Sequence, residues 1–400
     1  MKGMDNMDQR IEKLTLWHRE KFGEKVGIKV VSAPGRVEIA GNHTDHNHGR
    51  VIAAAVDLDT VAVVSPRDDN AVTLYSEGYQ RPFQLNLDTL APQESEKSTS
   101  LGLIRGVAAK MKELGYRIGG FDAVASSRVF KGSGLSSSAA FEVMVCAIFD
   151  ALYNGFVVEA KERARIAQYA ENVYYGKPCG LMDQTASSVG GLVGIDFGGE
   201  VAKVTAIQYD FEKAGYYAAV ISCGGDHGNL TDEYASIPAE MKSVAKACGK
   251  EVLRDVGEEA FYAALPSLKG KVSDRAILRA MHFFDEDKRV PQIIQALQND
   301  DIHTFLKLIN ASGDSSLALL QNITVAGSPN QEMAICYALA TRLTQGRGAR
   351  RINGGGFAGT ILAFVPIDLY DQFEKGMNDV FGQGAVTRLS IRSQGAMIIA

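Results

Sequence analysis

The sequence is poor in the features that mark secreted, membrane-bound and nucleic-acid-binding chains. Its five cysteines are scattered, odd in number and never spaced as a Cys-x-x-Cys pair, which favours free thiols in a reducing compartment. No apolar run approaches the roughly 20 residues that cross a bilayer, and no basic stretch would attract nucleic acid. The first 23 residues predict a charged amphipathic helix and not a signal peptide. We therefore expect a cytoplasmic protein without membrane or nucleic-acid partners.

The length of 400 residues exceeds what one ordinary hydrophobic core organises, so we expect two domains. The glycine pair Gly198–Gly199 marks the expected boundary, which gives an N-terminal domain of residues 1–198 and a C-terminal domain of residues 199–400. Helical and strand-like segments follow one another without a regular strand–helix–strand repeat, which favours the α+β class over a doubly wound sheet. The expected elements are strands within 27–68 and at 71–76, 120–130 and 216–225, helices at 101–116, 139–152 and about 158–174, a mainly helical region from about 231 to 345, and a final helix with a strand-like end.

One glycine- and serine-rich segment, Lys131–Val143, runs directly into an apolar stretch with the character of a helix. Glycines allow backbone angles that other residues avoid, and a serine at the junction is a natural N-cap. The first turn of a helix leaves N–H groups unpaired at the positive end of the helix dipole, which predicts a site for an anion such as phosphate. The segment lacks the ending of a Walker loop and the third glycine of a dinucleotide fingerprint, where Ser137 stands instead. Such segments are usually only loops, but the regular apolar sequence on both sides weakens that interpretation.

Four segments in register resemble one family of small-molecule kinases. Residues 33–49 (APGRVEIAGNHTDHNHG), 132–140 (GSGLSSSAA) and 354–359 (GGGFAG) are similar to three signatures of the galactokinase branch of the GHMP kinases, which are named for galactose, homoserine, mevalonate and phosphomevalonate. Residues 178–184 (PCGLMDQ) are similar to the segment that carries the family's catalytic aspartate. The resemblance covers nearly the whole chain and implies two α+β domains with the active site in the cleft between them. It also implies a sugar 1-kinase that transfers the γ-phosphoryl group of ATP to the anomeric hydroxyl of galactose or of a close relative.

The resemblance implies ATP and Mg²⁺ as cofactors. Phosphoryl transfer requires charge neutralisation, alignment and removal of the hydroxyl proton. Mg²⁺ would be held by Ser137 or Ser138 together with Glu171, since this hard ion keeps few protein ligands and several waters. Without the family, Glu171 would be interpreted as a solvated helix carboxylate. The ATP-binding residues would be Gly132, Ser133, Gly134, Leu135, Ser136, Ser137 and Ser138, and the loop of Gly354, Gly355 and Gly356 would close over the phosphates.

The resemblance also assigns the catalytic pair. Asp183 matches the family's general base, and Arg36 matches the cation that keeps this base ionised and stabilises the emerging alkoxide. Without the family, Arg36 would be a surface ion-pair partner and Asp183 a helix cap. His43, His46 and His48 invite a metal site, but positions spaced along one loop lack a second cluster of ligands. The implied sugar-binding residues are Asn42, His43, Asp45, Gly180 and Tyr234, whose donors and acceptors suit sugar hydroxyls.

The first signature departs from the family at two positions. The family's glutamate before the signature histidine, which bonds the sugar's outer hydroxyl, is here Asn42, and the family's asparagine four residues earlier is Glu38. We therefore predict that Glu38 and Asn42 share a hydrogen bond with the carboxylate and the amide exchanged. A neutral Asn42 could also donate a hydrogen bond to a carboxylate at C6 of the sugar. The Asp45–His46 pair and residues 311–315 also resemble the corresponding segments of galacturonate kinases more than those of galactokinases. Galacturonate, or another C2- or C6-modified galactose, is therefore the alternative to galactose.

Two other classes of function stay open at this stage. One is a sensor that binds sugar and ATP without catalysis, and the other is a GHMP kinase for a non-sugar alcohol. The retained Ser136–Ser138, Glu171, Arg36 and Asp183 favour an active enzyme, and the HTDHN segment favours a sugar. Residues 99–105 lack the tryptophan that many galactokinases place near adenine, so we assign no adenine contacts. We expect a monomer that acts on a small-molecule sugar.

Overall fold

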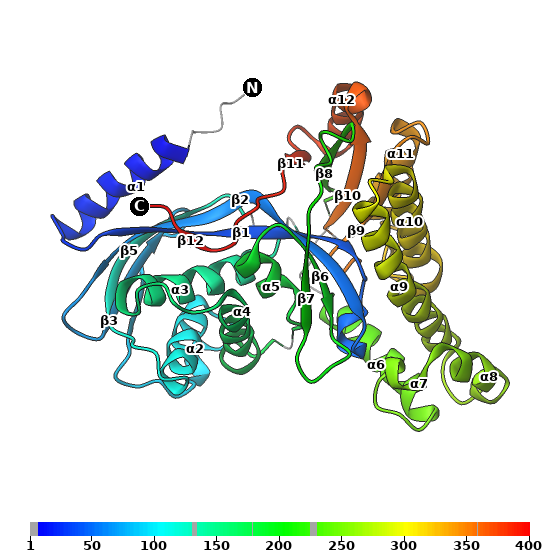
Figure 1. The fold of residues 1–400 in the computed structure, drawn as a ribbon, viewed down its shortest axis with the longest axis horizontal. Helices are drawn as coiled ribbons and strands as arrows, with labels where there is room; N and C mark the ends of the chain where they lie inside the picture. Colours follow the sequence, from blue (N-terminus) through cyan, green and yellow to red (C-terminus); the bar gives the residue numbers. More distant parts are fainter. Residues whose placement is uncertain (1–6, 130–133, 178, 225–229, 358) are drawn as a thin grey trace.

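The computed structural model describes residues 7–129, 134–177, 179–224, 230–357 and 359–400. Within these residues, helices cover two β-sheets, one of eight strands and one of four (Figure 1). This mixture of separate sheets and helices confirms the predicted α+β class. No described helix combines the length and the apolar character that a bilayer-crossing segment needs.

The larger sheet is built mainly from the first half of the chain. Its strands run in the order β12-β1-β2-β5-β3-β4, and the hairpin of β6 and β7 pairs with the first residues of β2. Neighbouring strands are antiparallel except for β3 and β5, which are parallel. The strands are β1 Lys29–Ala40, β2 Arg50–Pro66, β3 Ala71–Ser76, β4 Phe83–Asn86, β5 Phe121–Ser127, β6 Leu192–Asp196, β7 Lys203–Ile207 and β12 Met397–Ile398.

The two longest strands, β1 and β2, carry the first signature to the site. Both are buried at nearly every position, because helices cover both faces of this part of the sheet. The β1–β2 register shifts between Pro34 and Arg36 and again between Glu38 and Ala40. Bulges of this kind re-aim side chains locally. Arg36 and Glu38 lie between the two shifts, and both side chains reach the same cavity.

Helices lie on both faces of the larger sheet. Figure 1 shows α1 on one face and α2, α3, α4 and α5 on the other. The apolar α3 is the most deeply buried of them and packs against β1 and β2. The predicted helix at about 158–174 is confirmed, although its last part has π-helical geometry, which often occurs at functional sites. The helices are α1 Met7–Phe22, α2 Ser100–Glu113, α3 Ser137–Tyr153, α4 Ala160–Tyr169 with its π-helical continuation Ala170–Tyr175, and α5 Met182–Val189.

The smaller sheet has the strand order β11-β8-β10-β9, and all of its pairs are antiparallel. Its side chains alternate between two cores: Ile221 packs with residues of α11 and α12, whereas Val220 packs with residues of α9 and α10. The strands are β8 Tyr216–Ser222, β9 Ala349–Asn353, β10 Thr360–Pro366 and β11 Val386–Leu389. The helices are α6 Thr231–Ala247, α7 Leu253–Val256, α8 Glu258–Leu268, α9 Asp274–Gln298, α10 Ile302–Ser315 with its π-helical continuation Ser316–Leu320, α11 Glu332–Leu343 and α12 Tyr370–Phe381.

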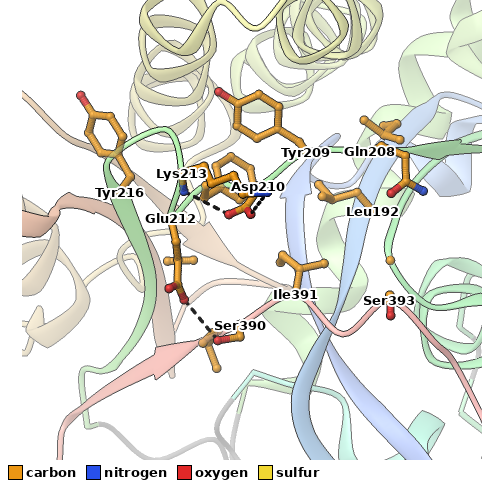
Figure 2. Close-up of a pocket in the computed structure, with 15 residues that line it drawn as sticks. Leu192, Gln208, Tyr209, Asp210, Glu212, Lys213, Tyr216, Ser390, Ile391 and Ser393 are labelled. Carbon is orange, nitrogen blue, oxygen red and sulfur yellow. Dashed lines mark hydrogen bonds and ion pairs between the residues drawn. The ribbon is translucent and has the colours of Figure 1, made fainter.

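The chain crosses between the two sheets at two adjoining segments, from β7 to β8 and from β11 to β12. Both β7 and β12 lie beyond the expected boundary at Gly198–Gly199, and both pair within the larger sheet. The crossings meet where the Ser390 hydroxyl donates to Glu212 Oε1 at 3.4 Å, beside a cavity of about 560 Å³ (Figure 2). None of the predicted site residues lines this cavity.

Candidate active site

Arg36 and Asp183 form a two-pronged ion pair between β1 and the first turn of α5. Arg36 donates from Nε to Asp183 Oδ1 and from Nη2 to Asp183 Oδ2, each over 2.6 Å. The arginine side chain is buried, so it is not the surface residue that its type alone suggests, whereas the aspartate side chain keeps 28% exposure. Two parallel charge-assisted bonds fix both the charge and the orientation of the carboxylate. The free surface of Asp183 remains within reach of a ligand.

The carboxyl group of Asp183 is ionised at neutral pH. Burial by itself would raise the pKa of Asp183, but the charge and hydrogen bonds of Arg36, the hydroxyl of Ser136 and the charge of Lys177 together lower it below its usual value. The Ser136 hydroxyl donates to Asp183 Oδ2 at 2.7 Å. Asp183 therefore accepts hydrogen bonds strongly but binds a proton weakly.

The start of α3 differs from the expected serine cap. Ser136 occupies the N-cap position, but its backbone is left-handed, with φ of 58°, and its side chain makes no cap hydrogen bond. The expectation of a serine side-chain cap is therefore wrong: the left-handed backbone leaves the hydroxyl oxygen without a bond to the helix N–H groups, and the hydroxyl donates to Asp183. The N–H groups of the first turn keep no capping side chain, which suits the predicted anion site.

Gly134 brings the glycine- and serine-rich loop against the smaller sheet. Its φ is +68°, and a Cβ there would lie 2.1 Å from Thr360 Oγ1, so only glycine fits. Its carbonyl accepts from Arg36 Nη1 at 2.5 Å and from Asn353 Nδ2 at 3.0 Å. Leu135 packs in the apolar core instead of facing the site. The predicted ATP-binding residues Gly132 and Ser133 lie outside the described residues.

A cavity of about 240 Å³, here called the phosphate-side cavity, opens beside this loop. It lies between the starts of helices α3 and α5 on one side and the glycine-rich loop that follows β9 on the other. Its lining consists of Arg36, Gly134, Ser136, Ser137, Ser138, Lys177, Asp183, Tyr234, Asn353, Gly354, Gly355, Gly356, Gly359 and Thr360. Gly354, Gly355 and Gly356 and the three predicted serines that the structure describes, Ser136, Ser137 and Ser138, thus line one cavity.

Glu171 is buried and bonds to Ser138 and Lys177, two residues that line this cavity. Its Oε1 accepts from the Ser138 hydroxyl at 3.2 Å and faces Lys177 Nζ at 3.4 Å, and its Oε2 accepts from Gln184 Nε2 at 2.8 Å. It is therefore not the solvated helix carboxylate of the simplest interpretation. Desolvation would lower the pKa of Lys177, but the combined attraction of Glu171 and Asp183 raises it, so this lysine stays charged.

A second carboxyl group, Glu142, lies behind Glu171. Gln184 Nε2 also donates to Glu142 Oε2 at 3.2 Å, while Glu142 Oε1 is buried without a partner among the described residues. Burial, together with the negative charge of Glu171, raises the pKa of Glu142 well above its usual value. Both effects favour the protonated form of Glu142.

A cavity of about 230 Å³, here called the sugar-side cavity, adjoins the first one. The two cavities have Arg36, Asp183, Gly354 and Gly355 in common. The remaining lining of the sugar-side cavity is Glu38, Asn42, His43, Asp45, His46, Cys179, Gly180 and Met182. The ion pair therefore stands between two hollows, one lined by the predicted ATP residues and one by most of the predicted sugar residues.

Asp45 and Gly180 meet in the sugar-side cavity. A Cβ at position 180 would lie 1.9 Å from Asp45 Oδ2, so glycine is required for this approach. Burial, reinforced by the negative charges of Glu38 and Asp183, raises the pKa of Asp45 to about 6, although the backbone N–H of His46 opposes the rise. The Asp45 carboxylate has no side-chain partner among the described residues.

His43 and His46 form a directed chain of hydrogen bonds. His43 Nε2 lies 3.0 Å from the Gly355 carbonyl, which can only accept, so this nitrogen carries the proton. His43 Nδ1 must then accept from His46 Nε2 at 3.4 Å, and His46 Nδ1 accepts from Asn47 Nδ2 at 2.9 Å. Burial lowers the pKa of both histidines, so each is neutral, as the chain requires.

Tyr234 lies on the phosphate side and not among the sugar-side residues. Its hydroxyl on α6 donates to the Gly356 carbonyl at 2.9 Å, and its ring packs edge-on against Phe357. Gly356 itself has φ of +87° and leaves room for Asn322. Tyr234 therefore positions the glycine-rich loop in this structure.

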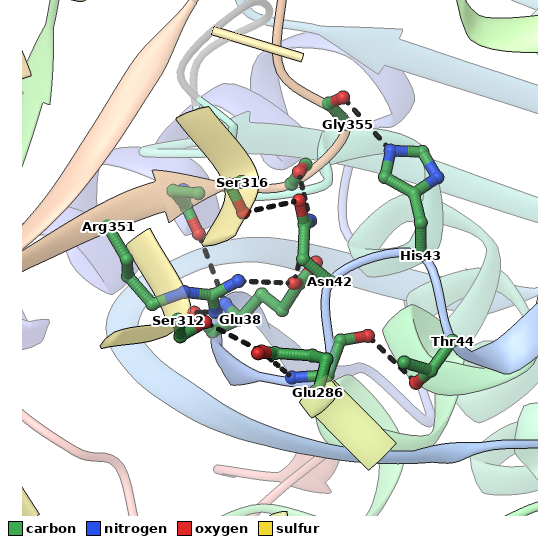
Figure 3. A network of polar contacts seen from close by, with 12 residues as sticks. Glu38, Asn42, His43, Thr44, Glu286, Ser312, Ser316, Arg351 and Gly355 are labelled. Atoms are coloured by element: carbon green, nitrogen blue, oxygen red, sulfur yellow. Dashed lines mark hydrogen bonds and ion pairs between the residues drawn. The ribbon is translucent and has the colours of Figure 1, made fainter. Parts of the chain in front are cut away.

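Asn42 is surrounded by hydrogen-bond partners (Figure 3). Its Nδ2 donates to Glu38 Oε1 at 2.9 Å and to the Gly354 carbonyl at 2.8 Å. Its Oδ1 accepts from Asn322 Nδ2 at 2.8 Å and from the Ser316 hydroxyl at 3.4 Å. The predicted hydrogen bond between positions 38 and 42 is confirmed, and it belongs to a network that ties the signature loop to α10 and the glycine-rich loop.

Helix α9 holds the same loop by its backbone. The Asn42 carbonyl accepts from His282 Nε2 at 3.0 Å, and the Gly41 N–H donates to Glu286 Oε1 at 2.9 Å. Ser315 and Ser312 on α10 donate to His282 Nδ1 and to Glu286 Oε1. The segment 311–315 therefore supports the loop from behind, through α9.

Several site residues escaped the sequence prediction. Lys177 directly precedes the segment 178–184, which resembles the family's catalytic segment. Its position in the sequence could therefore have indicated a cation near Glu171 and Asp183. Asn353, Asn322 and Arg351 gave no such signal, since their partners lie hundreds of residues away in the chain.

The fold is that of a GHMP kinase. A family model for the GHMP kinase N-terminal domain matches residues 102–191, and one for the galactokinase galactose-binding signature matches residues 17–66. A galactokinase of Streptomyces coelicolor is 32% identical over 369 residues, which cover 90% of this chain and 92% of that protein. The chain therefore belongs to the galactokinase family, which confirms the resemblance seen in the sequence.

Solved structures agree on the fold. The galactokinase of Lactococcus lactis complexed with galactose superposes with a TM-score of 0.83 at 24% identity, over 97% of this chain and 99% of that chain. The mevalonate kinase of Methanococcus jannaschii superposes with a TM-score of 0.64 at 17% identity, over 92% of this chain and 99% of that chain. Family membership makes the protein a sugar kinase that uses ATP, and it disfavours a kinase for a non-sugar alcohol.

Proposed function

We propose that the protein transfers the γ-phosphoryl group of ATP to the anomeric hydroxyl of galactose. The observation that carries the proposal is the Arg36–Asp183 pair, which stands between two adjoining cavities and lines both. Galactose in one cavity and the phosphates of ATP in the other would meet at this pair. Holding both reactants in line is the main task of a phosphoryl-transfer enzyme.

Asp183 orients the attacking hydroxyl and receives its proton. The lowered pKa of Asp183 makes it a weak base, so the proton moves to the carboxylate as the new O–P bond forms, not before. Arg36 keeps the carboxylate in place and offsets negative charge that develops on the sugar oxygen. The Ser136 hydroxyl donates to Asp183 Oδ2 and helps to hold the carboxylate in this orientation.

The phosphates of ATP bind to the loop and helix start at Gly134 and Ser136–Ser138. The uncapped N–H groups of α3 point to an anion site, and Lys177 adds a positive charge to the same cavity. Gly354, Gly355 and Gly356 line the cavity from the other side. Gly132 and Ser133 are assigned to the phosphates by resemblance alone.

Ser138 and Glu171 suit Mg²⁺. Their oxygens lie 3.2 Å apart and form a hard ligand set, in which Ser138 lines the cavity and the buried Glu171 lies behind it. We assign Ser138 over Ser137 because Ser138 bonds directly to this carboxylate. When bound, the ion would neutralise charge on the transferred phosphoryl group. Lys177 now balances Glu171 and would turn toward the phosphates in the complete site.

The sugar-side cavity favours a neutral sugar. Three carboxylates line it, those of Asp45, Glu38 and Asp183. Among the described residues of its lining, Arg36 carries the one arginine or lysine charge, and this charge is already paired with Asp183. An anionic uronate would meet these carboxylates without a free cation, and like charges repel. The amide of Asn42, which suggested galacturonate, is fully used by protein partners. Galactose therefore ranks ahead of galacturonate.

The free cysteines and the single-chain site bear on the location and the assembly of the protein. The cysteines of the structure are free, which fits the reducing cytoplasm. One chain supplies every residue of the proposed site, so we propose that a monomer is sufficient for activity.

An ATP-consumption assay with galactose, galacturonate, N-acetylgalactosamine and arabinose tests the proposal, with Asp183→Asn as the inactive control. We expect turnover with galactose and none with the variant. Turnover of galacturonate alone would replace the substrate, and tight sugar binding without turnover of any sugar would make the protein a sensor.

A further inference from the structure

Glu38 is a buried carboxylate with one oxygen in use and one oxygen free. Its Oε1 accepts from Asn42 Nδ2 at 2.9 Å and from Arg351 Nη2 at 2.7 Å. Its main-chain N–H donates to Asn353 Oδ1 at 3.1 Å, and its carbonyl accepts from Arg351 Nη1. Its Oε2 accepts from none of the described residues. The residue is 3% exposed, and it lines the sugar-side cavity.

Arg351 fixes Glu38 from behind. It lies on β9, is wholly buried and does not line the cavity, so its charge is not available to a ligand. Removing two charges from water is costly unless the pair is well bonded, and here the arginine bonds both the carboxylate and the carbonyl of Glu38. The pair therefore holds the carboxylate in one orientation, with Oε2 as its unused acceptor.

Asn42 is a fixed spacer and not a ligand-binding amide. Both of its Nδ2 hydrogens and its Oδ1 are bonded to protein groups, so a sugar hydroxyl finds no free position on it. Breaking any of these bonds would leave a buried polar group unpaired, which is costly. Among Glu38 and Asn42, only the carboxylate has capacity for a substrate.

We propose that Glu38 Oε2 accepts a hydrogen bond from a non-anomeric hydroxyl of the sugar, so that Glu38 is a specificity-determining residue. The inference rests on the proposed sugar kinase function and refines its sugar site. Position 38 thereby supplies the recognition carboxylate, while Asn42 and Arg351 hold it in place. The ligand is a neutral aldose that presents a hydroxyl donor to this end of the cavity.

Glu38→Gln, measured against galactose and each of its singly deoxygenated analogues, tests the proposal. A charge-assisted hydrogen bond is about twice as strong as a neutral one, so we expect the variant to raise KM and the calorimetric Kd for galactose about tenfold. Because the contact exists in the ground state and in the transition state, kcat should change little. The variant and the natural enzyme should bind one of the deoxy analogues with equal affinity. The hydroxyl that this analogue lacks is the one that donates to Glu38.

A structural role would behave differently. If Glu38→Gln weakened binding of galactose and of every deoxy analogue by the same factor, Glu38 would not contact the sugar and the inference would fail. Should Glu38→Gln not fold because it leaves Arg351 unpaired, Glu38→Gln/Arg351→Gln removes both charges, and the same pattern is expected from it. Calorimetry separates the two proposals: a protein that binds galactose through Glu38 without turning it over retains this inference and loses the kinase function. Absence of any sugar binding contradicts both.

Discussion

The two cavities that meet at Arg36 and Asp183 are built in opposite ways. The phosphate-side cavity consists of one loop, one helix start and one glycine-rich turn, and its polar groups are largely backbone or hydroxyl. The sugar-side cavity consists of side chains that bond to one another, with partners from β1, α9, α10 and β9. A phosphate can be recognised by backbone N–H groups and charge alone. A neutral sugar needs donors and acceptors fixed in number and direction.

The largest expected effect comes from Asp183, one of the four residues that line both cavities. Asp183→Asn keeps the shape of the side chain but removes the proton acceptor and half of the ion pair with Arg36. We expect kcat to fall about 10³-fold or more, since general-base catalysis is worth roughly 10² to 10⁴. Steady-state turnover measures the loss, and calorimetry should show that galactose still binds. Turnover within tenfold of the natural enzyme would remove Asp183 from the chemistry.

The hydrogen-bond network of the sugar-side cavity is tested by exchanging the carboxylate of Glu38 and the amide of Asn42. Asn42→Glu places a second carboxylate against Glu38 in a buried site, and we expect it to lower the free energy of unfolding by about 3 kcal/mol. Adding Glu38→Asn should recover at least about 1 kcal/mol, because the pair is then complementary again. Urea denaturation of both single variants and the double variant gives the coupling. Strictly additive effects would show that the two positions do not interact.

Acid should weaken the support of the sugar-side loop. Burial of His282 lowers its pKa to about 4, against about 6.5 in the unfolded chain. As the pH falls below 6.5, the unfolded chain binds a proton that the folded chain refuses, so stability is lost progressively down to about pH 4. The loss from this group approaches about 3 kcal/mol at its lower end.

His282→Gln provides the matched control for the acid effect. Glutamine does not titrate, so the difference in unfolding free energy between the natural protein and the variant should shrink as the pH falls from 6.5 to 4. The comparison is needed because Asp45, whose pKa is raised to about 6 by burial, shifts stability in the opposite sense over the same range. A difference that is independent of pH would mean that His282 has the same pKa in the folded protein as in the unfolded chain, and would contradict the account.

The smallest expected effect concerns the contact between Gly180 and Asp45. Gly180→Ala places a methyl group where Asp45 Oδ2 now lies, and the carboxylate can move away because it is the end of a side chain. We expect KM for galactose to rise about tenfold, equivalent to about 1.4 kcal/mol, with KM for ATP unchanged. Equal changes in both constants would show that the two cavities are not separate sites.

The sequence predicts one cavity far better than the other. Local rules for helix starts and phosphate binding predict an anion site at the glycine- and serine-rich loop, whereas Glu171, Arg36 and Asp183 were assigned by the resemblance to the kinase family. The hydrogen bond between Glu38 and Asn42 could be predicted because four residues separate them. Arg351 could not, since it lies 313 residues from Glu38 and reaches it only through the packing of β9.

Two details needed the structure for a different reason. The Ser136 hydroxyl was expected to cap α3, but the left-handed backbone of Ser136 makes no side-chain cap, and the hydroxyl donates to the ionised Asp183. Tyr234 was assigned to the sugar, whereas its hydroxyl bonds to Gly356 on the phosphate side. Both outcomes depend on which acceptor the fold brings to one hydroxyl, and sequence does not reveal that acceptor.

Phosphorus NMR of the product formed from ATP and galactose tests the central claim most directly. The arrangement of the two cavities around Arg36 and Asp183 predicts a single sugar phosphate whose phosphorus couples to the anomeric proton. A product phosphorylated at any other hydroxyl, or ATP hydrolysis without a sugar phosphate, would contradict the account.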